Sequence, residues 1–168
     1  MELLSKDINL QAQGESGPVS PASELLEPSE PLSAPRHTPP ILVVDDCRIN
    51  RRVAVLMLKQ LGYTADVVES GREALSAIRA GSYELVFMDV QMPEMNGLEA
   101  SAKIRQAQAA GVVGFAPGLR IVAYTTNATP EDRAACISAG MDDHLAKPVS
   151  PDRMTAILEK YLAACSGG

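Results

Sequence analysis

Three aspartates in this sequence follow short apolar runs. Asp45 and Asp46 follow the run 41–44 (ILVV), and Asp89 follows the run 85–88 (LVFM). Continuous aliphatic runs of this length, each followed by an amphipathic helical pattern, indicate strands of a parallel sheet that is buried on both faces. Because such sheets bind ligands at the carboxyl ends of their strands, we expect the three acids to converge on one pocket.

A pocket that collects three carboxylates needs a cation or a proton to offset their repulsion. Two unit charges about 4 Å apart repel by roughly 4 kcal/mol at an effective dielectric near 20. Mg2+ prefers carboxylate oxygens, keeps several water ligands and is commonly completed by phosphate oxygens. The three acids therefore predict a Mg2+ site.

Two further runs lead a hydroxyl group and a cation to the same edge of the predicted sheet. Thr125 follows the run 120–124 (RIVAY), and Lys147 follows the run 142–146 (DDHLA). Acids that hold a metal, a hydroxyl donor and a lysine together suit a tetrahedral oxyanion that is bound to one of the acids. This combination predicts a phosphoryl group carried by an aspartate.

Four motifs resemble those of response-regulator receiver domains of two-component signalling. In the order and spacing of that family, they are VVDD at 43–46, DVQMPEMNG at 89–97, AYTT at 123–126 and KP at 147–148. The similarity covers about residues 41–164. It implies a phosphoacceptor module in a phosphorelay, which catalyses its own phosphorylation and slow dephosphorylation. The DVQMP sequence and the pair Asn50-Arg51 resemble receivers of hybrid histidine kinases more than those of transcriptional regulators.

The resemblance also implies a role for each matching residue. Asp89 would be the phosphoacceptor, while Thr125 and Lys147 would contact the phosphoryl oxygens. The groups that would hold Mg2+ are Asp45, Asp46, Asp89 and the backbone carbonyl of Gln91. Positioning and charge neutralisation supply most of the catalysis in phosphoryl transfer, and the metal and Lys147 suit the second task.

Five strand candidates alternate with five helical patterns from residue 41 onward. The predicted strands are 41–45, 64–68, 84–88, 120–124 and 142–146, and the predicted helices are 48–61, 71–80, 97–109, 130–139 and 151–164. Short right-handed crossovers then predict an α/β fold, a doubly wound five-stranded parallel sheet of flavodoxin-like order 2-1-3-4-5 with helices on both faces. Gly62, Gly81 and Gly140 are expected to end helices in the left-handed conformation.

Residues 1–40 differ in composition from the rest of the chain. They hold seven of the twelve prolines, six acids and two bases, and no aromatic residue. Without apolar mass to offset the entropy of ordering, such a segment is expected to be disordered. We therefore predict a disordered Pro/Ser/Glu-rich linker or tail over 1–39, a receiver domain over 40–165 and a short C-terminal tail over 166–168.

Composition argues against several classes of function. Residues 41–168 have a net charge of about −2 and no basic stripe with interleaved aromatics, so direct binding of nucleic acid is not expected. No apolar run approaches the roughly 20 residues of a membrane span, and the N-terminus lacks signal-peptide features. The three cysteines have no paired spacing. We expect a cytoplasmic protein whose segment makes no membrane contact.

Two alternatives to a hybrid-kinase receiver remain. The first is a stand-alone, single-domain response regulator. The second is an aspartyl-phosphate-type phosphatase, which also uses an acid, a threonine and a lysine around Mg2+. Such phosphatases usually resemble Asp-x-Asp at the nucleophile strand, whereas Gln91 stands at the second acid position here.

The predicted helix 48–61 has a second possible use besides packing. Its apolar residues Ile49, Val53, Met57 and Leu61 recur every four positions, which is typical of a core-facing stripe. The start of the helix borders the acid pocket, however. In receivers this edge docks the histidine-bearing helix of a histidine kinase dimerisation domain or a histidine phosphotransfer domain. Asn50, Arg51 and Arg52 would form the polar part of that surface.

Two features depart from the usual receiver pattern. His144 stands where many receivers have an aromatic side chain that moves inward when the threonine at the position of Thr125 binds phosphate. The connection 106–119 into the fourth predicted strand is longer than usual, which a surface loop tolerates. Its apolar residues Val112, Val113 and Phe115 are alternatively expected to contact a partner.

Overall fold

The computed structural model describes residues 41–162. The predicted tail over 1–39, residue 40, and the predicted domain end and C-terminal tail over 163–168 lie outside the described residues. In the range 41–162, none of the helices combines the length and the apolar character that crossing a bilayer requires.

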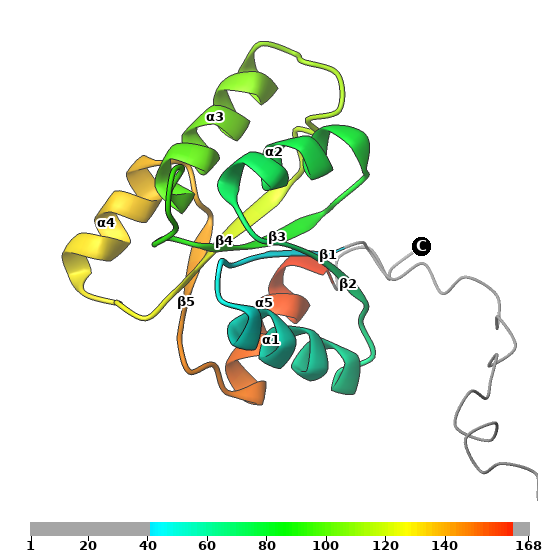
Figure 1. The fold of residues 1–168 in the computed structure, drawn as a ribbon, viewed down its shortest axis with the longest axis vertical. Coiled ribbons are helices and arrows are strands. Elements are labelled where there is room, and N and C mark those ends of the chain that lie inside the picture. Colours follow the sequence, from blue (N-terminus) through cyan, green and yellow to red (C-terminus); the bar gives the residue numbers. More distant parts are fainter. Residues whose placement is uncertain (1–40, 163–168) are drawn as a thin grey trace, which may run out of the picture. The chain divides into compact units, whose positions relative to one another are not determined.

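Strands and helices alternate along the described chain (Figure 1). The strands are β1 (Ile41–Val44), β2 (Ala65–Val68), β3 (Leu85–Asp89), β4 (Arg120–Thr125) and β5 (Asp143–Ala146). The helices are α1 (Arg48–Gln60), α2 (Gly71–Ala80), α3 (Gly97–Ala109), α4 (Pro130–Ser138) and α5 (Pro151–Leu162). The predicted elements are confirmed, with small differences at their ends.

The strands form one parallel sheet in the order β2-β1-β3-β4-β5, as predicted. In its register Val44 lies beside Met88, and Asp89 lies beside Tyr124. The carboxyl ends of β1, β3 and β4 therefore meet at one edge of the sheet. The segments that follow these strands carry the predicted site residues.

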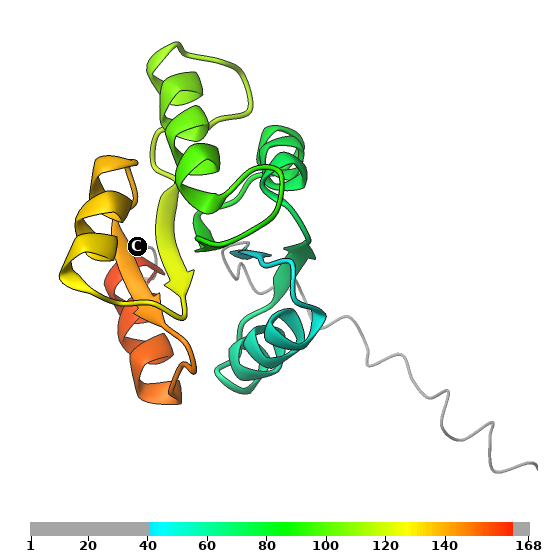
Figure 2. The ribbon, with the colours of Figure 1, turned by 60° about the vertical axis from the view of Figure 1, so that its left-hand side comes forward.

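Alternate strand residues point to two separate cores. One core joins Val43, Phe87 and Tyr124 to α1 and α5, and the other joins Val44, Met88 and other strand residues to α2, α3 and α4. The two sets of helices lie on opposite sides of the sheet (Figures 1 and 2). Central strands covered on both faces explain why β1 and β3 are continuous apolar runs.

The buried side of α1 differs from the predicted stripe. Arg51, Ala54 and Leu58 are its buried residues, whereas Ile49 and Val53 are 71% and 45% exposed. Steps of three and four residues follow the helical period, so Arg51 begins the stripe that faces the sheet. The prediction of a core-facing stripe was wrong for Ile49 and Val53.

Local signals explain most helix ends. The side chains of Ser70 and Asn96 accept hydrogen bonds from backbone N–H groups in the first turns of α2 and α3. Gly62 and Gly140 have φ of +89° and +90°, as predicted for left-handed ends. Gly81 does not, because its φ is −111°. A Cβ there would lie 2.7 Å from the Tyr83 ring, so close packing is what excludes a side chain.

The long connection between α3 and β4 is partly folded onto the domain. Phe115 is partly buried and packs against the core beneath α2 and α3, so it is not the exposed residue that the alternative interpretation of this connection assumed. Val113 is 89% exposed. This connection enters β4 at Arg120, the end of the strand opposite to Thr125.

Arg105 fixes the base of this connection. Its Nη1 donates to the carbonyl oxygen of Leu119 at 2.9 Å, and its Nε donates to that of Gly140 at 2.7 Å. Its Nη2 lies 2.6 Å from Asp142 Oδ2. One side chain of α3 thereby joins the start of β4 to the turn before β5.

Candidate functional site

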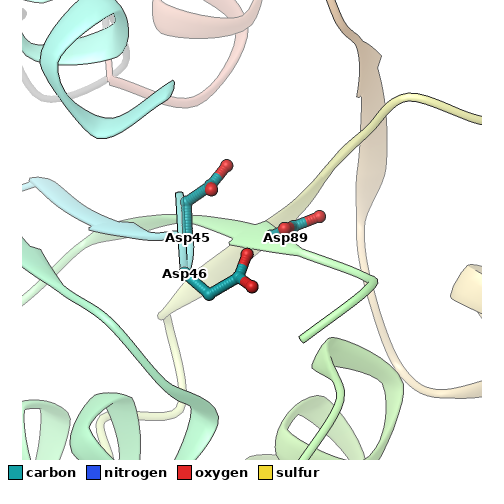
Figure 3. Close-up of side chains that lie close together, drawn as sticks. All are labelled: Asp45, Asp46 and Asp89. Carbon is teal, nitrogen blue, oxygen red and sulfur yellow. The ribbon is translucent and has the colours of Figure 1, made fainter. Parts of the chain in front are cut away.

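Three carboxylates lie together where β1 and β3 end (Figure 3). Asp45 directly follows β1 and is fully buried, and Asp89 is the last residue of β3 and is 5% exposed. Asp46 is exposed. One oxygen from each of the three lies within 4.8 Å of the others. The predicted convergence of these acids is confirmed.

Asp45 is held by hydrogen bonds to both of its carboxylate oxygens. Oδ1 accepts from the backbone N–H of Cys47 at 2.8 Å and from Asn50 Nδ2 at 3.2 Å. Oδ2 accepts from Lys147 Nζ at 2.5 Å. Within residues 41–162, in contrast, no protein group donates to the carboxylate of Asp46. Asp46 therefore offers free oxygens at the mouth of a site whose inner acid is fixed.

Lys147 contacts both buried acids through its side chain and β4 through its backbone. Its Nζ lies 3.3 Å from Asp89 Oδ1 in addition to its contact with Asp45. Its backbone N–H donates to the carbonyl oxygen of Thr125 at 2.8 Å, and the peptide bond to Pro148 is cis. The lysine side chain is 8% exposed. Its ammonium group is thus held between two buried carboxylates.

Opposing influences act on Asp89. Burial raises the pKa of its carboxyl above the ordinary value, and the charge of Asp45 raises it further. The positive charge of Lys147 and a hydrogen bond from the backbone N–H of Gln91, at 3.2 Å, act in the opposite direction. The net result is a raised pKa, so this site favours any further positive charge that stabilises the carboxylate.

The acid cluster fits a divalent cation. Three carboxylates face one ammonium group, which leaves a formal charge of −2 when all four groups are ionised. Carboxylate oxygens are hard ligands of the kind that Mg2+ prefers. Asp46 has unpaired oxygens for direct ligation, and the cluster is the one group of this kind among the described residues.

The other two predicted site residues lie near the cluster, Thr125 through the pairing of β3 with β4 and Gln91 through its place in the chain. Thr125 ends β4 and is 3% exposed, and its Oγ1 accepts a hydrogen bond from the backbone N–H of Asn127 at 3.1 Å. The Thr125 hydroxyl can still donate its own proton. Gln91 is exposed two residues after Asp89. The role predicted for its carbonyl oxygen stays a prediction.

Arg51 was predicted to lie on the exposed docking surface, but the structure shows that it is buried. It is 8% exposed, and its Nη1 donates to the carbonyl oxygens of Asp45 at 2.7 Å and Asp46 at 3.1 Å. Its Nη2 pairs with Glu69. Arg51 therefore supports the backbone of both acids and is not part of an exposed docking surface. Its spacing of three and seven residues from Ala54 and Leu58 is the signal that would have revealed this.

His144 takes no part in the acid cluster. It is partly buried, and its Nδ1 accepts a hydrogen bond from Arg133 Nε at 3.1 Å. Burial lowers the pKa of its imidazole, and the charge of Arg133 lowers it further. A neutral histidine is therefore favoured at the position where many receivers have an aromatic ring.

Comparison with known protein families agrees with this geometry. A sequence model of the response regulator receiver domain matches residues 41–159. The chain belongs to the response-regulator receiver family. It is a receiver domain of two-component signalling, and its five-stranded sheet has the order expected of that fold.

Similar curated proteins are histidine kinases. The receiver is 37% identical over 179 residues to Histidine kinase 5 of Arabidopsis thaliana, covering 90% of this chain and 19% of that protein. It is 34% identical over 146 residues to Hybrid signal transduction histidine kinase B of Dictyostelium discoideum, covering 83% of this chain and 7% of that protein. The chain thus spans less than a fifth of either relative.

Two solved structures are informative about such sites. The receiver domain of sensor histidine kinase PA1611 from Pseudomonas aeruginosa has magnesium coordinated in its active-site cleft. It is 34% identical, with a TM-score of 0.65, covering 74% of this chain and 98% of that one. The receiver domain of Ssk1 from Saccharomyces cerevisiae was solved with the histidine phosphotransfer protein Ypd1. It is 25% identical, with a TM-score of 0.70, covering 76% and 91% of the two chains.

Proposed function

We propose that this receiver accepts a phosphoryl group on Asp89 from a phosphohistidine donor, with Mg2+ held by Asp45, Asp46, Asp89 and the Gln91 carbonyl. The observation that carries the proposal is the position of Lys147 Nζ, 2.5 Å from Asp45 and 3.3 Å from Asp89. A fixed cation beside one buried carboxylate of an acid cluster suits transfer of an anionic group to that carboxylate.

The proposed reaction is an in-line displacement at phosphorus. An Asp89 carboxylate oxygen attacks, an O–P bond forms, and the P–N bond to the donor imidazole breaks. The imidazole leaves with the electron pair of that bond and takes a proton from solvent. Lys147 and the Thr125 hydroxyl would contact the oxygens of the transferred group. When bound, Mg2+ supplies additional charge neutralisation, which together with positioning accounts for most of the catalysis of such transfers.

The donor is proposed to be a helical histidine domain, either a kinase dimerisation domain or a phosphotransfer domain. Support comes from α1, where Ile49, Val53 and Leu56 are 71%, 45% and 52% exposed beside the acid-bearing segment. A hollow of about 280 Å³ next to them is lined by residues that include Val53, Lys147 and Pro148. An exposed apolar surface that borders the reacting carboxylate suits a helix that presents its histidine to Asp89.

The larger protein is proposed to be a hybrid histidine kinase, because the similar curated proteins described above are histidine kinases. A stand-alone response regulator is the alternative. The proposal includes a cytoplasmic location, which the free thiols of Cys47 and Cys136 support. The phosphatase alternative has no supporting observation, since Gln91 replaces the second acid of the Asp-x-Asp pattern.

Chemical labelling tests the proposal. We expect acetyl phosphate to label the protein in Mg2+ buffer with an acid-labile, hydroxylamine-sensitive phosphoryl group, and Asp89→Asn to abolish that label while circular dichroism shows an intact fold. Asp66→Asn is the matched control, because Asp66 lies exposed on β2 of the same sheet. Labelling that persists on another residue of Asp89→Asn would remove Asp89 from its assigned role.

A further inference from the structure

We propose that Tyr124 is a positioning residue for phosphoryl transfer, because its aromatic ring holds the Lys147 ammonium group between Asp45 and Asp89. Lys147 Nζ lies 4.6 Å from the centre of the Tyr124 ring. The inference rests on the function proposed for Asp89 and Lys147 and adds a residue that contacts neither the phosphoryl group nor the metal.

The geometry of β4 makes this contact a fixed one. Tyr124 is 3% exposed and directly precedes Thr125, and it lies beside Asp89 in the register of β3 and β4. Its ring belongs to the core that joins the sheet to α1 and α5. A packed core side chain has little freedom to move. The ring therefore gives Lys147 a contact surface whose position is fixed by the sheet.

The face of the ring is the part that matters. An ammonium group within about 6 Å of an aromatic centroid is attracted by the ring quadrupole, and the attraction increases when water is excluded. The Tyr124 hydroxyl donates to no other residue in the described range. Burial, followed by the charges of Asp45 and Asp89, raises its pKa to about 12, so the ring stays uncharged near neutral pH.

Lys147 needs such a support because its ion pairs with Asp45 and Asp89 would both change during the proposed transfer. Asp89 would become phosphorylated, and Asp45 and Asp89 would both face the metal, so the two ion pairs change during transfer. The ring contact does not depend on either event. Tyr124 and Lys147 both line the hollow of about 280 Å³ next to the acids. The ring thus stays beside the lysine while its two ion pairs change.

Substitution at position 124 tests the ring contact. We expect Tyr124→Leu, which keeps an apolar side chain, to slow labelling by acetyl phosphate by roughly tenfold at saturating Mg2+. Tyr124→Phe retains the ring and should recover most of the rate. The affinity for Mg2+, measured by calorimetry, should change less than about threefold in both variants, because Lys147 is not a metal ligand. If Tyr124→Leu fails to fold, Tyr124→Met takes its place, since methionine fills irregular core space.

A double-mutant cycle separates positioning of Lys147 from a general effect on the core. In a Lys147→Ala background, Tyr124→Leu should slow labelling by less than about twofold, because the group that the ring holds is absent. Tyr161→Leu is the matched control. The Tyr161 ring lies 5.0 Å from Lys160 Nζ, so it forms a similar lysine–tyrosine contact. Lys160 also donates a hydrogen bond to Asp143, the first residue of β5. Loss of the lysine–tyrosine contact should leave the labelling rate unchanged.

A spectroscopic measurement checks the contact without substitution at the site. The ring current of Tyr124 should move the proton signals of the Lys147 ε-methylene upfield, and Tyr124→Leu should abolish that displacement. The inference is overturned if this displacement is absent, or if Tyr124→Leu is labelled at the wild-type rate. It is also overturned if Tyr124→Phe is labelled as slowly as Tyr124→Leu, or if Tyr124→Leu slows labelling as much in the Lys147→Ala protein as in the wild type. A label that survives Asp89→Asn instead contradicts the proposed function.

Discussion

The guanidinium group of Arg51 donates a hydrogen bond to the backbone carbonyl oxygen of Asp45 across 2.7 Å. The same nitrogen also reaches the carbonyl oxygen of Asp46, and the Arg51 charge is paired with Glu69, which follows β2. The backbone that presents both acids is therefore supported from below by α1. A helix whose exposed side is proposed to receive the donor thus also supports the acid cluster through its buried side.

Removal of this support should destabilise the domain. Arg51→Ala leaves the carbonyl oxygens of Asp45 and Asp46 without their donor and leaves Glu69 without its partner. We expect a loss of about 3 kcal/mol in the free energy of unfolding, measured with urea. Arg52→Ala, on the exposed side of α1, should change it by less than about 0.5 kcal/mol. Equal losses would show that the buried hydrogen bonds contribute little.

The two adjacent acids should respond in opposite ways to neutralisation. Asp46→Asn should weaken Mg2+ binding by about tenfold or more, yet leave metal-free stability unchanged or slightly higher, because its carboxylate lacks a donor and lies near two other acids. Asp45→Asn removes the charge of the closer of the two buried carboxylates that pair with Lys147, and should lower the free energy of unfolding by about 3 kcal/mol. Calorimetric Mg2+ titration and urea unfolding without metal measure both effects. A large loss of unfolding free energy in metal-free Asp46→Asn would contradict the idea that the three carboxylates repel one another.

The exposed side of α1 should matter only for a protein donor. Val53→Glu puts a charge on the proposed docking surface, so transfer from a phosphorylated histidine domain should slow by about tenfold or more. Labelling by acetyl phosphate should slow far less, since Val53 is 45% exposed and outside the core, even though it lines the hollow beside Lys147. Ile137→Glu on α4 is the matched control, being 58% exposed on another helix. Equal slowing with both donors would mean that the substitution disturbs the acid site.

A pH-dependent contribution to stability is expected from Asp143. Burial alone would raise the pKa of its carboxyl, but hydrogen bonds from Lys160, the His144 backbone and Tyr161 outweigh burial and lower the pKa. A lowered folded-state pKa stabilises the fold above the unfolded pKa, and that contribution is lost as pH falls through the folded pKa. Asp143→Asn should therefore cost stability at pH 7 and progressively less below about pH 4. Urea unfolding at several pH values measures the difference in unfolding free energy between the wild type and Asp143→Asn. A difference that grows as the pH falls would contradict this prediction.

The sheet and most of the acid site could be predicted because they depend on local patterns. Apolar runs buried on both faces identify β1 and β3, and the first polar residues after such runs are the ones that reach the carboxyl edge. This logic located Asp45 and Asp89 without knowledge of any contact, whereas Lys147 follows β5, which is not a continuous apolar run. The logic depends only on the period of the strand and on the topology of a parallel sheet.

The supporting residues could not be predicted by the same logic. The spacing of Arg51 from Ala54 and Leu58 indicates its buried side, but the sequence does not show that its partners are two backbone carbonyl oxygens. Tyr124 was counted only as a strand residue, because its contact is with Lys147, which follows the neighbouring strand β5 and is distant in sequence. Gly81 was expected to have a left-handed φ, whereas the Tyr83 ring explains its small size. Each of these depends on tertiary contacts.

The connection fixed at its base by Arg105 offers a position for a reporter group. Val113 is 89% exposed and lies in the segment that enters β4 at the end opposite to Thr125. A fluorophore attached through Val113→Cys would therefore leave the acid edge of the sheet clear for a donor helix. The native Cys47 is exposed next to Asp46, and Cys165 lies outside the described residues, so selective attachment requires that serine replace both. Such a labelled receiver would allow donor binding to be followed by anisotropy without a tag near the reacting carboxylate.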